Sequence, residues 1–352
     1  MRYIVAMDSF KGSLTSEEAG KAVADNLKSH DEEAEIKVLS VSDGGEGMLD
    51  VFCKATHATR LSVLTRDALM RRIEAQYAIT PDGTAIIEVA QACGLMHIEH
   101  EQRNPMRTTS YGVGLLIADA LRHNCHKMII GLGGSATSDA GIGMLRALID
   151  TFAPEDHFNA IRPLFDNCEV ILASDVTNPL YGINGAAHVF AKQKGATSSM
   201  IEALDARAKQ FALHTKKAMG FDKSRQPGAG AAGGLGYAFM QFLNAKMQSG
   251  AELLLHLLQF DKLLAHADIV ITGEGKSDCQ TLMGKLPAVI MQHARQHHLP
   301  TLLLSGQIED HDSLITAGFK AACAVTPSDM PLEEAMIPEK AKANIRDFPL
   351  PI

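Results

Sequence analysis

The sequence of 352 residues contains no tryptophan, and aromatic residues make up only 5% of it. Its core must therefore be built mainly from aliphatic side chains. None of the six cysteines belongs to a Cys-x-x-Cys pair or shows the spacing of a zinc site, so we expect reduced thiols in a cytoplasmic protein. No uninterrupted apolar run approaches the ~18 residues that a membrane span needs, and we expect no membrane partner.

Positive charge is also scarce. The net charge is −8, and no basic stripe with interleaved aromatic residues is present, which argues against nucleic acid as a partner. Hydrophobic residues make up 46% and charged residues 21%, as in an ordinary globular protein. Anionic ligands must therefore be bound by local lysines, arginines and helix N-termini rather than by the overall field.

Two familiar nucleotide-binding motifs are missing from the positions where they would be expected. A Walker A loop ending at Gly275-Lys276-Ser277 would need glycine at position 270, where the chain has valine. The Gly-x-Gly-x-x-Gly fingerprint does not follow the first predicted strand, which argues against a nicotinamide enzyme.

The ends of the chain alternate between strand and helix patterns. A capping box at residues 15–18 predicts the start of the first helix, between strands at residues 4–7 and 36–39. After residue 262 the same alternation returns, with a closing helix expected over residues 333–345. We predict a Rossmann-like parallel α/β domain formed by residues 1–60 and 262–352.

The middle of the chain has a different pattern. Residues 59–64, 72–80 and 84–89 are strand-like, and Pro81-Asp82-Gly83 between the last two predicts an antiparallel hairpin. We predict that residues 61–261 form an inserted mixed α+β domain, with an active-site cleft between the two domains. Either a monomer or a homodimer is compatible with the sequence.

Three segments set an acidic residue among glycines directly after a short aliphatic run: residues 8–13, 43–47 and 273–278. Ligands of open α/β sheets bind beyond the carboxyl ends of the strands. Lys11 and Lys276 offer positive charge for phosphate, and the carboxylates can hold Mg²⁺. Together the three segments predict one phosphate-handling site.

Two further glycine-rich segments admit two interpretations each. Residues 131–143 follow a predicted strand and precede a helix, so they could bind an anion or form only a tight turn. Residues 227–236 could cradle phosphate or permit close helix packing. Lys194 is a candidate phosphate contact, although a surface lysine is the common alternative.

Three polar positions have similar alternatives. Arg107 could form a bidentate pair with a carboxylate while the following hydroxyl residues cap a helix. Alternatively, it could be a surface arginine. Asp175, at a predicted strand end, could be a metal ligand or general base, or it could form an Asx turn. His293 lies near a polar helix end, and we expect it to be solvated.

Eight strings, in order across nearly the whole chain, resemble the bacterial type-1 glycerate kinase family. They are residues 8–13, 42–47, 104–112, 131–137, 175–180, 193–196, 227–236 and 271–278. The resemblance implies ATP-dependent phosphorylation of D-glycerate with Mg²⁺, most often giving 2-phosphoglycerate. Alternatives are a 3-kinase, a kinase of another small hydroxy acid, or a non-catalytic sugar-acid sensor.

With the resemblance, each candidate residue receives an expected role. For catalysis we expect Asp8, Lys11, Asp175 and Lys276. For substrate binding we expect Ser9, Asn104, Arg107, Thr108 and Asn178. For phosphate or nucleotide binding we expect Gly133, Gly134, Ser135, Lys194, Gly230, Gly233, Gly273 and Gly275. For the metal we expect Asp43, Glu46, Glu274 and Asp278.

Overall fold

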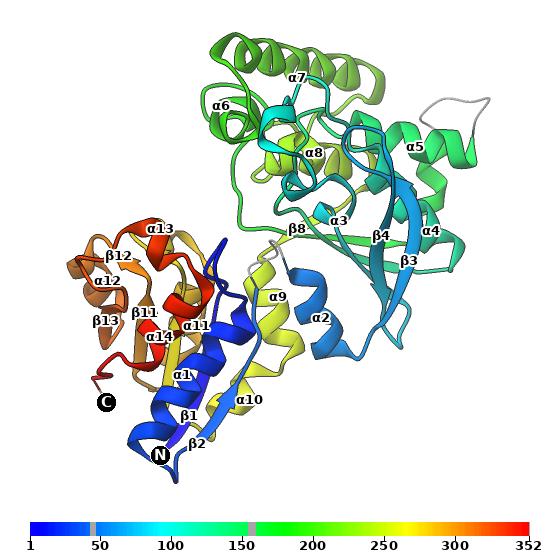
Figure 1. Cartoon of the computed structure of the whole chain (residues 1–352). Helices are drawn as coiled ribbons and strands as arrows, with labels where there is room; N and C mark the ends of the chain where they lie inside the picture. The colour runs from blue at the N-terminus through cyan, green and yellow to red at the C-terminus, as the bar shows by residue number, and fades with distance from the viewer. Residues whose placement is uncertain (43–46, 154–159, 352) are drawn as a thin grey trace. The chain divides into compact units, whose positions relative to one another are not determined.

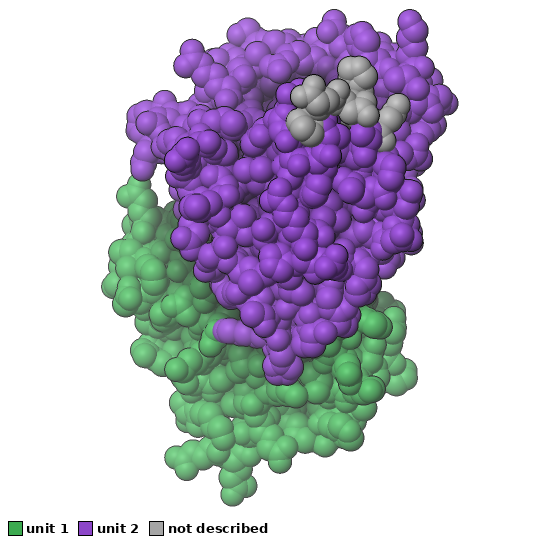
Figure 2. Space-filling model, turned by 90° about the vertical axis from the view of Figure 1, so that its right-hand side faces the viewer, with its two compact units in different colours: residues 1–43, 251–352 green, residues 44–250 purple. Residues whose placement is uncertain are grey.

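The computed structural model describes residues 1–42, 47–153 and 160–351. Figure 2 shows the chain divided into two compact units, unit 1 with residues 1–43 and 251–352 and unit 2 with residues 44–250. The predicted boundaries at residues 60 and 261, with a site between the two parts, stay a prediction. Among the described residues, no helix has both the length and the apolar character needed to cross a membrane.

The described part of unit 1 contains a five-stranded sheet in the order β2-β1-β9-β11-β13, and each neighbouring pair is parallel (Figure 1). The strands are β1 (Arg2–Met7), β2 (Glu35–Val38), β9 (Ile269–Gly273), β11 (Thr301–Ser305) and β13 (Ala321–Ala324). A separate pair of short strands, β10 (Lys276–Ser277) and β12 (Gln307–Ile308), is also parallel. The predicted parallel α/β architecture is confirmed.

Helices cover both faces of this sheet. They are α1 (Ser16–His30), α9 (Gly250–Leu257), α10 (Phe260–Leu264), α11 (Leu286–Gln296), α12 (His311–Ala317), α13 (Leu332–Ala335) and α14 (Pro338–Arg346), with a 3-10 turn η6 (Thr281–Met283). Leu302 and Leu304 of β11 pack with α1 and α14, whereas Leu303 packs on the other face with α11 and α12. This division follows from the alternation of side chains along a strand.

The capping box that was predicted at the start of α1 is present. The hydroxyl of Thr15 accepts a hydrogen bond from the Glu18 backbone N–H at 3.2 Å, and the Glu18 carboxylate accepts one from the Thr15 N–H at 3.0 Å. The closing helix is not continuous as predicted: α13 ends at Ala335 and α14 begins at Pro338. Proline lacks the N–H that would continue the earlier helix and instead suits the first turn of a new one.

His293 on α11 is not solvated as expected. Its ring nitrogens lie 2.8 Å from the Asp261 carboxylate and 3.0 Å from the Glu252 carboxylate, and its side chain is 17% exposed. Both acids come from other helices, so their proximity to His293 cannot be read from helical spacing.

The described part of unit 2 contains a six-stranded sheet in the order β3-β4-β5-β6-β7-β8. The strands are β3 (Thr59–Arg66), β4 (Arg72–Ile79), β5 (Thr84–Glu88), β6 (Lys127–Gly131), β7 (Glu169–Ala173) and β8 (Lys246–Gln248). The first three are antiparallel neighbours, and β5 to β8 are parallel. The predicted hairpin is confirmed: the Thr80 N–H donates to the Thr84 carbonyl at 2.9 Å.

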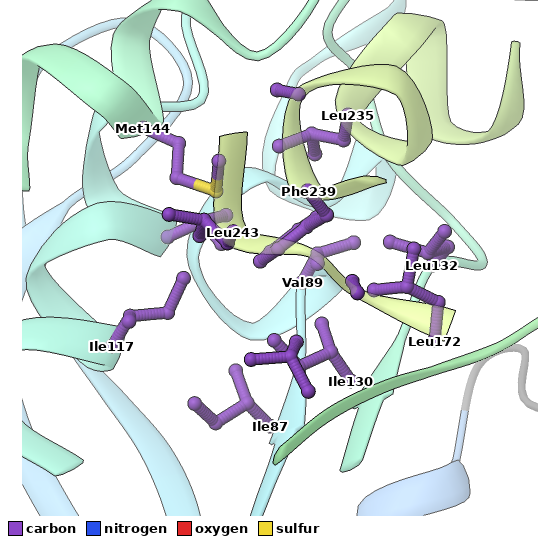
Figure 3. Packing of buried hydrophobic residues seen from close by; sticks show 14 of the residues in the cluster. Ile87, Val89, Ile117, Ile130, Leu132, Met144, Leu172, Leu235, Phe239 and Leu243 are labelled. Carbon is purple, nitrogen blue, oxygen red and sulfur yellow. The ribbon is translucent and has the colours of Figure 1, made fainter. Parts of the chain in front are cut away.

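Helices of unit 2 complete its core. They are α2 (Met48–Thr56), α3 (Ala90–Cys93), α4 (Tyr111–Arg122), α5 (Ile142–Phe152), α6 (Ala186–Phe190), α7 (Ser198–Met219) and α8 (Ala231–Leu243), with 3-10 turns η1 (Leu95–His97), η2 (His100–Gln102), η4 (Arg162–Phe165) and η5 (Lys192–Lys194). Ile87, Ile130 and Leu172 form a buried row across β5, β6 and β7 (Figure 3). Ile117 of α4 and Phe239 of α8 belong to the same cluster.

Candidate active site

The carboxyl ends of β1 and β9 bring two of the predicted acids together. The strands pair in register up to Met7 and Gly273, and the Asp8 N–H donates to the Gly273 carbonyl at 2.8 Å. Asp8 and Glu274, the next residue of each strand end, are both only 7% exposed. Two of the three predicted segments therefore meet at one edge of the sheet. Asp43 and Glu46, from the remaining segment, lie outside the described residues.

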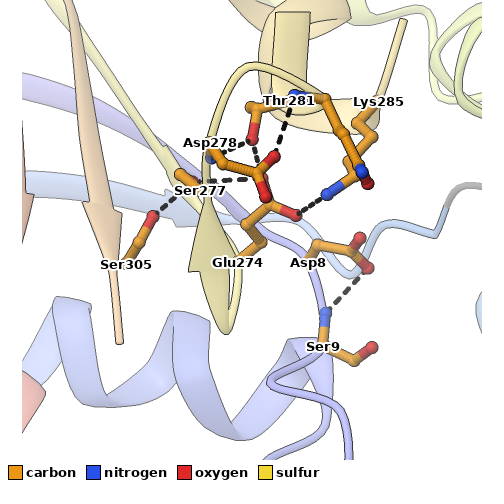
Figure 4. A network of polar contacts seen from close by, with 9 residues as sticks. Asp8, Ser9, Glu274, Ser277, Asp278, Thr281, Lys285 and Ser305 are labelled. Atoms are coloured by element: carbon orange, nitrogen blue, oxygen red, sulfur yellow. Dashed lines mark hydrogen bonds and ion pairs between the residues drawn. The ribbon is translucent and has the colours of Figure 1, made fainter. Parts of the chain in front are cut away.

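The Glu274 carboxylate is the centre of a hydrogen-bond network (Figure 4). One of its oxygens accepts from the Ser277 hydroxyl at 3.0 Å and from the Thr281 hydroxyl at 2.6 Å. The other accepts from the Lys285 ammonium at 3.2 Å. Burial of a carboxylate requires such partners, so this network satisfies the hydrogen-bonding capacity of both Glu274 oxygens at a buried strand end.

Asp278 has a different environment from Glu274. One of its oxygens accepts from the Gln280 N–H at 2.8 Å, and its own N–H donates to the Thr281 hydroxyl at 3.1 Å. Asp278 is half-buried. It therefore organises the turn η6, and within the described residues no hydrogen bond to its other oxygen is present, so that oxygen can accept from a further partner.

A pocket of about 380 Å³ lies at this edge of the sheet, lined by residues of unit 1. Its polar lining includes Asp8, Ser9, Lys11, Glu274, Lys276 and Lys285. Its apolar lining is formed by Phe10, Val325, Leu332, Ala335, Met336 and Ala341. The pocket therefore joins several residues predicted from the sequence with Lys285, which the sequence did not single out. The sequence signal available for Lys285 is that Pro287, which suits the first turn of a helix, follows it by two residues.

The two predicted lysines of this region are solvent-accessible. Lys276 forms an ion pair with Glu309 at 2.8 Å, and its side chain is 48% exposed. The hydrogen bond that Lys276 donates to the Glu309 carboxylate raises the pKa of Lys276. Lys11 is exposed at the pocket wall. Both ammonium groups are accessible to an anion that enters the pocket.

In unit 2, a buried lysine donates two hydrogen bonds to the loop after β6. Lys194 is 4% exposed, and its ammonium donates to the Ser135 hydroxyl at 3.2 Å and to the Thr137 carbonyl at 2.7 Å. Burial lowers the pKa of Lys194 to about 8. Among the described residues no carboxylate forms an ion pair with it. The alternative of an ordinary surface lysine is therefore wrong.

Asp139 connects this loop to two helix starts and was not among the site residues predicted from the sequence. One of its oxygens accepts from the Ser110 N–H at 2.8 Å, from the Ser110 hydroxyl at 2.9 Å and from the Gly143 N–H at 3.1 Å. The other accepts from the Gly141 N–H at 3.1 Å. The available signal was an acid shortly before a predicted helix, where carboxylates are favourable.

The segment before α4 lies against the same loop. Thr108 donates its hydroxyl hydrogen to the Ala136 carbonyl at 3.1 Å, and the Asn104 side chain accepts from the Met106 N–H at 3.0 Å. Arg107 is exposed, and within the described part of the chain its guanidinium forms no ion pair. Thr108 and Asn104 thus have structural partners, while Arg107 is accessible to an external carboxylate.

The glycines at 230 and 233 lie where backbone segments approach closely. A Cβ on Gly230 would lie 2.3 Å from the Pro179 carbonyl oxygen, and one on Gly233 would lie 1.9 Å from the Thr137 carbonyl oxygen. The Gly230 N–H also donates to the Asn178 carbonyl at 2.8 Å. The close-packing interpretation of residues 227–236 is therefore supported at these positions, and a phosphate contact there stays a prediction.

Asp175 and Asn178 follow β7. Asp175 is half-buried. The side-chain amide of Asn178 donates to the Asn184 carbonyl at 2.9 Å, which shapes the loop around it. Gly133 and Gly134 lie in the neighbouring loop after β6, where Gly134 is exposed with φ of 70° and its carbonyl accepts from the Leu95 N–H at 2.8 Å. The roles of these residues toward a ligand stay predictions.

In unit 1, carboxylates and lysines gather at the carboxyl ends of the strands of a doubly wound parallel sheet. This arrangement is typical of α/β enzymes that bind small anionic ligands at that edge. The comparison with known proteins specifies the class further. The profile of the glycerate kinase family matches residues 3–157 and 149–349, and the chain belongs to this family. It is therefore a kinase, a transferase of phosphoryl groups.

Relatives of this family align over nearly the whole chain. The glycerate kinase of Halalkalibacterium halodurans is 36% identical over 366 residues, covering 97% of this chain and 96% of the relative. The glycerate 2-kinase of Escherichia coli is 36% identical over 354 residues, covering 95% and 93%. A crystal structure of a Salmonella typhimurium protein assigned as glycerate kinase 2 superposes with a TM-score of 0.78 at 34% identity, covering 98% of this chain and 95% of that one.

Proposed function

We propose that this protein transfers the γ-phosphoryl group of ATP to D-glycerate and releases ADP and 2-phosphoglycerate. The observation that carries the proposal is the similarity to the Escherichia coli protein named glycerate 2-kinase, 36% identical over 95% of this chain. The pocket beyond β1 and β9 supports it, because it combines buried carboxylates with accessible lysines.

The reaction needs positioning and charge neutralisation more than covalent catalysis. The acceptor hydroxyl oxygen bonds to the γ-phosphorus, and the bond from that phosphorus to the bridging oxygen breaks with its electrons going to ADP. The hydroxyl proton passes to a base, for which Asp8 and Asp175 are the candidates. The Ser9 N–H donates to the Asp8 carboxylate at 2.7 Å and so orients it. Lys11 and Lys276 would offset charge on the transferred group.

Unit 2 is the proposed source of contacts to the acceptor carboxylate. Arg107 is the principal candidate, because an exposed guanidinium can form two parallel hydrogen bonds with a carboxylate. Asn104, Thr108 and Asn178 shape the surrounding loops through the hydrogen bonds given above. Thr108 is buried and acts in this proposal mainly by fixing the backbone beside Arg107.

The described carboxylates fit Mg²⁺ bound together with nucleotide phosphates. Such a metal commonly uses one or two protein carboxylates, several waters and the phosphates themselves. Asp278 has an oxygen free of the contacts given above, whereas both oxygens of Glu274 already accept hydrogen bonds. No group of three or more metal-ligating side chains is present among the described residues. Asp278 is therefore the favoured ligand of this pair, and the metal would screen the phosphate charges.

Turnover with Mg-ATP and D-glycerate, with enolase as the only coupling enzyme, tests the proposal. A signal with enolase alone identifies 2-phosphoglycerate. ADP release without that signal would indicate the 3-phosphate or hydrolysis without transfer. No ADP release would exclude D-glycerate as the acceptor. The variant Asp8→Asn serves as a control for contaminating kinases and should show sharply reduced kcat.

A further inference from the structure

The pocket of unit 1 has two chemically different walls. One wall comes from the loop after β13, from α13 and the residue after it, and from α14, with Val325, Leu332, Ala335, Met336 and Ala341. Leu332 and Met336 are 58% and 40% exposed, so large apolar side chains line the pocket while still facing solvent. Exposed apolar surface gathered at a pocket often marks a ligand site.

The apolar wall is joined to the turn after β1. A Cβ on Gly12 would lie 3.0 Å from the methyl carbon of Met336, so this side chain lies directly over the turn that carries Lys11. Lys11 and Met336 both line the pocket. A ligand here would therefore contact an apolar surface and a cation at the same time.

The other wall is cationic and lies at a helix N-terminus. Lys285 is the residue before α11, and its ammonium contacts Glu274 at 3.2 Å while its side chain is 34% exposed. Figure 4 shows Lys285 reaching the Glu274 carboxylate, with Asp8 nearby. The backbone of the first turn of α11 adds partial positive charge, which favours phosphate.

These walls match an adenine nucleotide better than the acceptor acid. A purine base is flat and largely apolar, whereas a three-carbon hydroxy acid has almost no apolar surface to bury. The pocket volume of about 380 Å³ lies in the range of sites for ligands much larger than glycerate.

We propose that this pocket binds the adenine nucleotide, with the base on the wall formed by Val325, Leu332, Ala335 and Met336. The phosphates extend toward Lys285 and the start of α11, and so toward Asp8. In this assignment the Lys285 ammonium binds the phosphate groups of the nucleotide. The inference rests on the proposed function only for the identity of the phosphoryl donor.

Calorimetric titration of the full chain with Mg-free ADP, together with steady-state kinetics, tests this assignment. Ala335→Trp places a large ring on the apolar wall, and the control Glu333→Trp adds the same ring to an exposed position of α13 that does not line the pocket. We expect Ala335→Trp to raise the Kd for ADP and the KM for ATP about tenfold, the ratio that 1.4 kcal/mol of lost contact gives. Glu333→Trp should change neither constant.

The variant Lys285→Met distinguishes the binding contribution of the phosphates from that of the base. We expect the Kd for ADP to rise about tenfold and that for adenosine by less than about twofold, because only ADP carries charged phosphates. The variant Lys285→Arg should retain most of the ADP affinity, and a melting curve of each variant verifies that it folds. Equal losses for ADP and adenosine would refute the role of Lys285.

The outcomes for the pocket and for the function can be told apart. If ADP binding is lost in Ala335→Trp while D-glycerate is never phosphorylated, the pocket assignment stands and the acceptor is wrong. If turnover occurs and Ala335→Trp leaves the KM for ATP unchanged, the assignment is wrong and the function stands. A raised KM for D-glycerate with an unchanged KM for ATP would place the acceptor in this pocket and overturn the inference.

Discussion

The buried Lys194 makes a prediction about stability at alkaline pH. Burial lowers its pKa from 10.5 to about 8 in the folded protein. The unfolded chain therefore holds this proton more tightly than the folded chain does, and stability must rise with pH wherever the two states differ in bound protons. The window lies between about pH 8 and pH 10.5. Below it both states are charged at Lys194, and above it both are neutral.

The size of the effect follows from the pKa change. Converted at 1.36 kcal/mol per unit, a decrease from 10.5 to about 8 corresponds to about 3 kcal/mol. Within the window, the contribution should grow by at most about 1.4 kcal/mol per pH unit, because a single proton is involved. The conversion applies here without a reduction for solvent screening, since Lys194 is only 4% exposed.

Comparison with Lys194→Met isolates this contribution from all other titrating groups. The free energy of unfolding is measured by urea titration from pH 7 to pH 11, and the variant is subtracted from the wild type. We expect the difference to rise through the window and to be flat on either side. Lys192→Met, at an exposed lysine two residues away, should give a flat difference throughout. A flat or falling curve for Lys194 would show that its ammonium is solvated, and the burial argument would fail.

Three further predictions concern single substitutions. Thr15→Ala removes the N-terminal cap of α1 and should lower the free energy of unfolding by about 1 kcal/mol in urea titrations; no change would mean that the cap is dispensable. Gly233→Ala would place a Cβ 1.9 Å from the Thr137 carbonyl oxygen, so it should destabilise much more than Gly220→Ala, where φ is also positive but no atom lies within 4 Å. Similar melting temperatures for these two variants would contradict the clash. Lys276→Ala should cut kcat sharply while shifting Tm little, because its ion pair with Glu309 is solvent-exposed and such pairs contribute little to stability; near-normal turnover would remove Lys276 from the chemistry.

Local sequence signals predicted most of the fold. Three kinds of signal act within a few residues, so the structure that each forms can be predicted from the sequence. They are the capping box at Thr15, the turn at Pro81-Asp82-Gly83 and the aliphatic runs of the parallel strands. The meeting of Asp8 and Glu274 was also predictable, since both follow buried parallel strands whose carboxyl ends lie at one sheet edge.

Residues whose roles depend on distant partners were missed or misjudged. Asp139 binds Ser110, Lys194 reaches the loop after β6, and His293 lies between acids of two other helices. No spacing rule connects these positions, because the contacts exist only once the helices have packed. Lys285 was overlooked for the same reason: its importance comes from Glu274, which precedes it by a loop and a 3-10 turn.

The glycines show why composition alone could not assign the site. Gly273 and Gly275 belong to one string, yet a Cβ on Gly273 would lie 1.7 Å from the Leu304 carbonyl oxygen, whereas one on Gly275 would have its nearest neighbour at 3.5 Å. Strand packing therefore requires glycine at 273, whether or not a ligand binds. Packing does not require it at 275, which lines the pocket. Of the two, Gly275 is the position where close approach of a ligand stays a prediction that packing does not already account for.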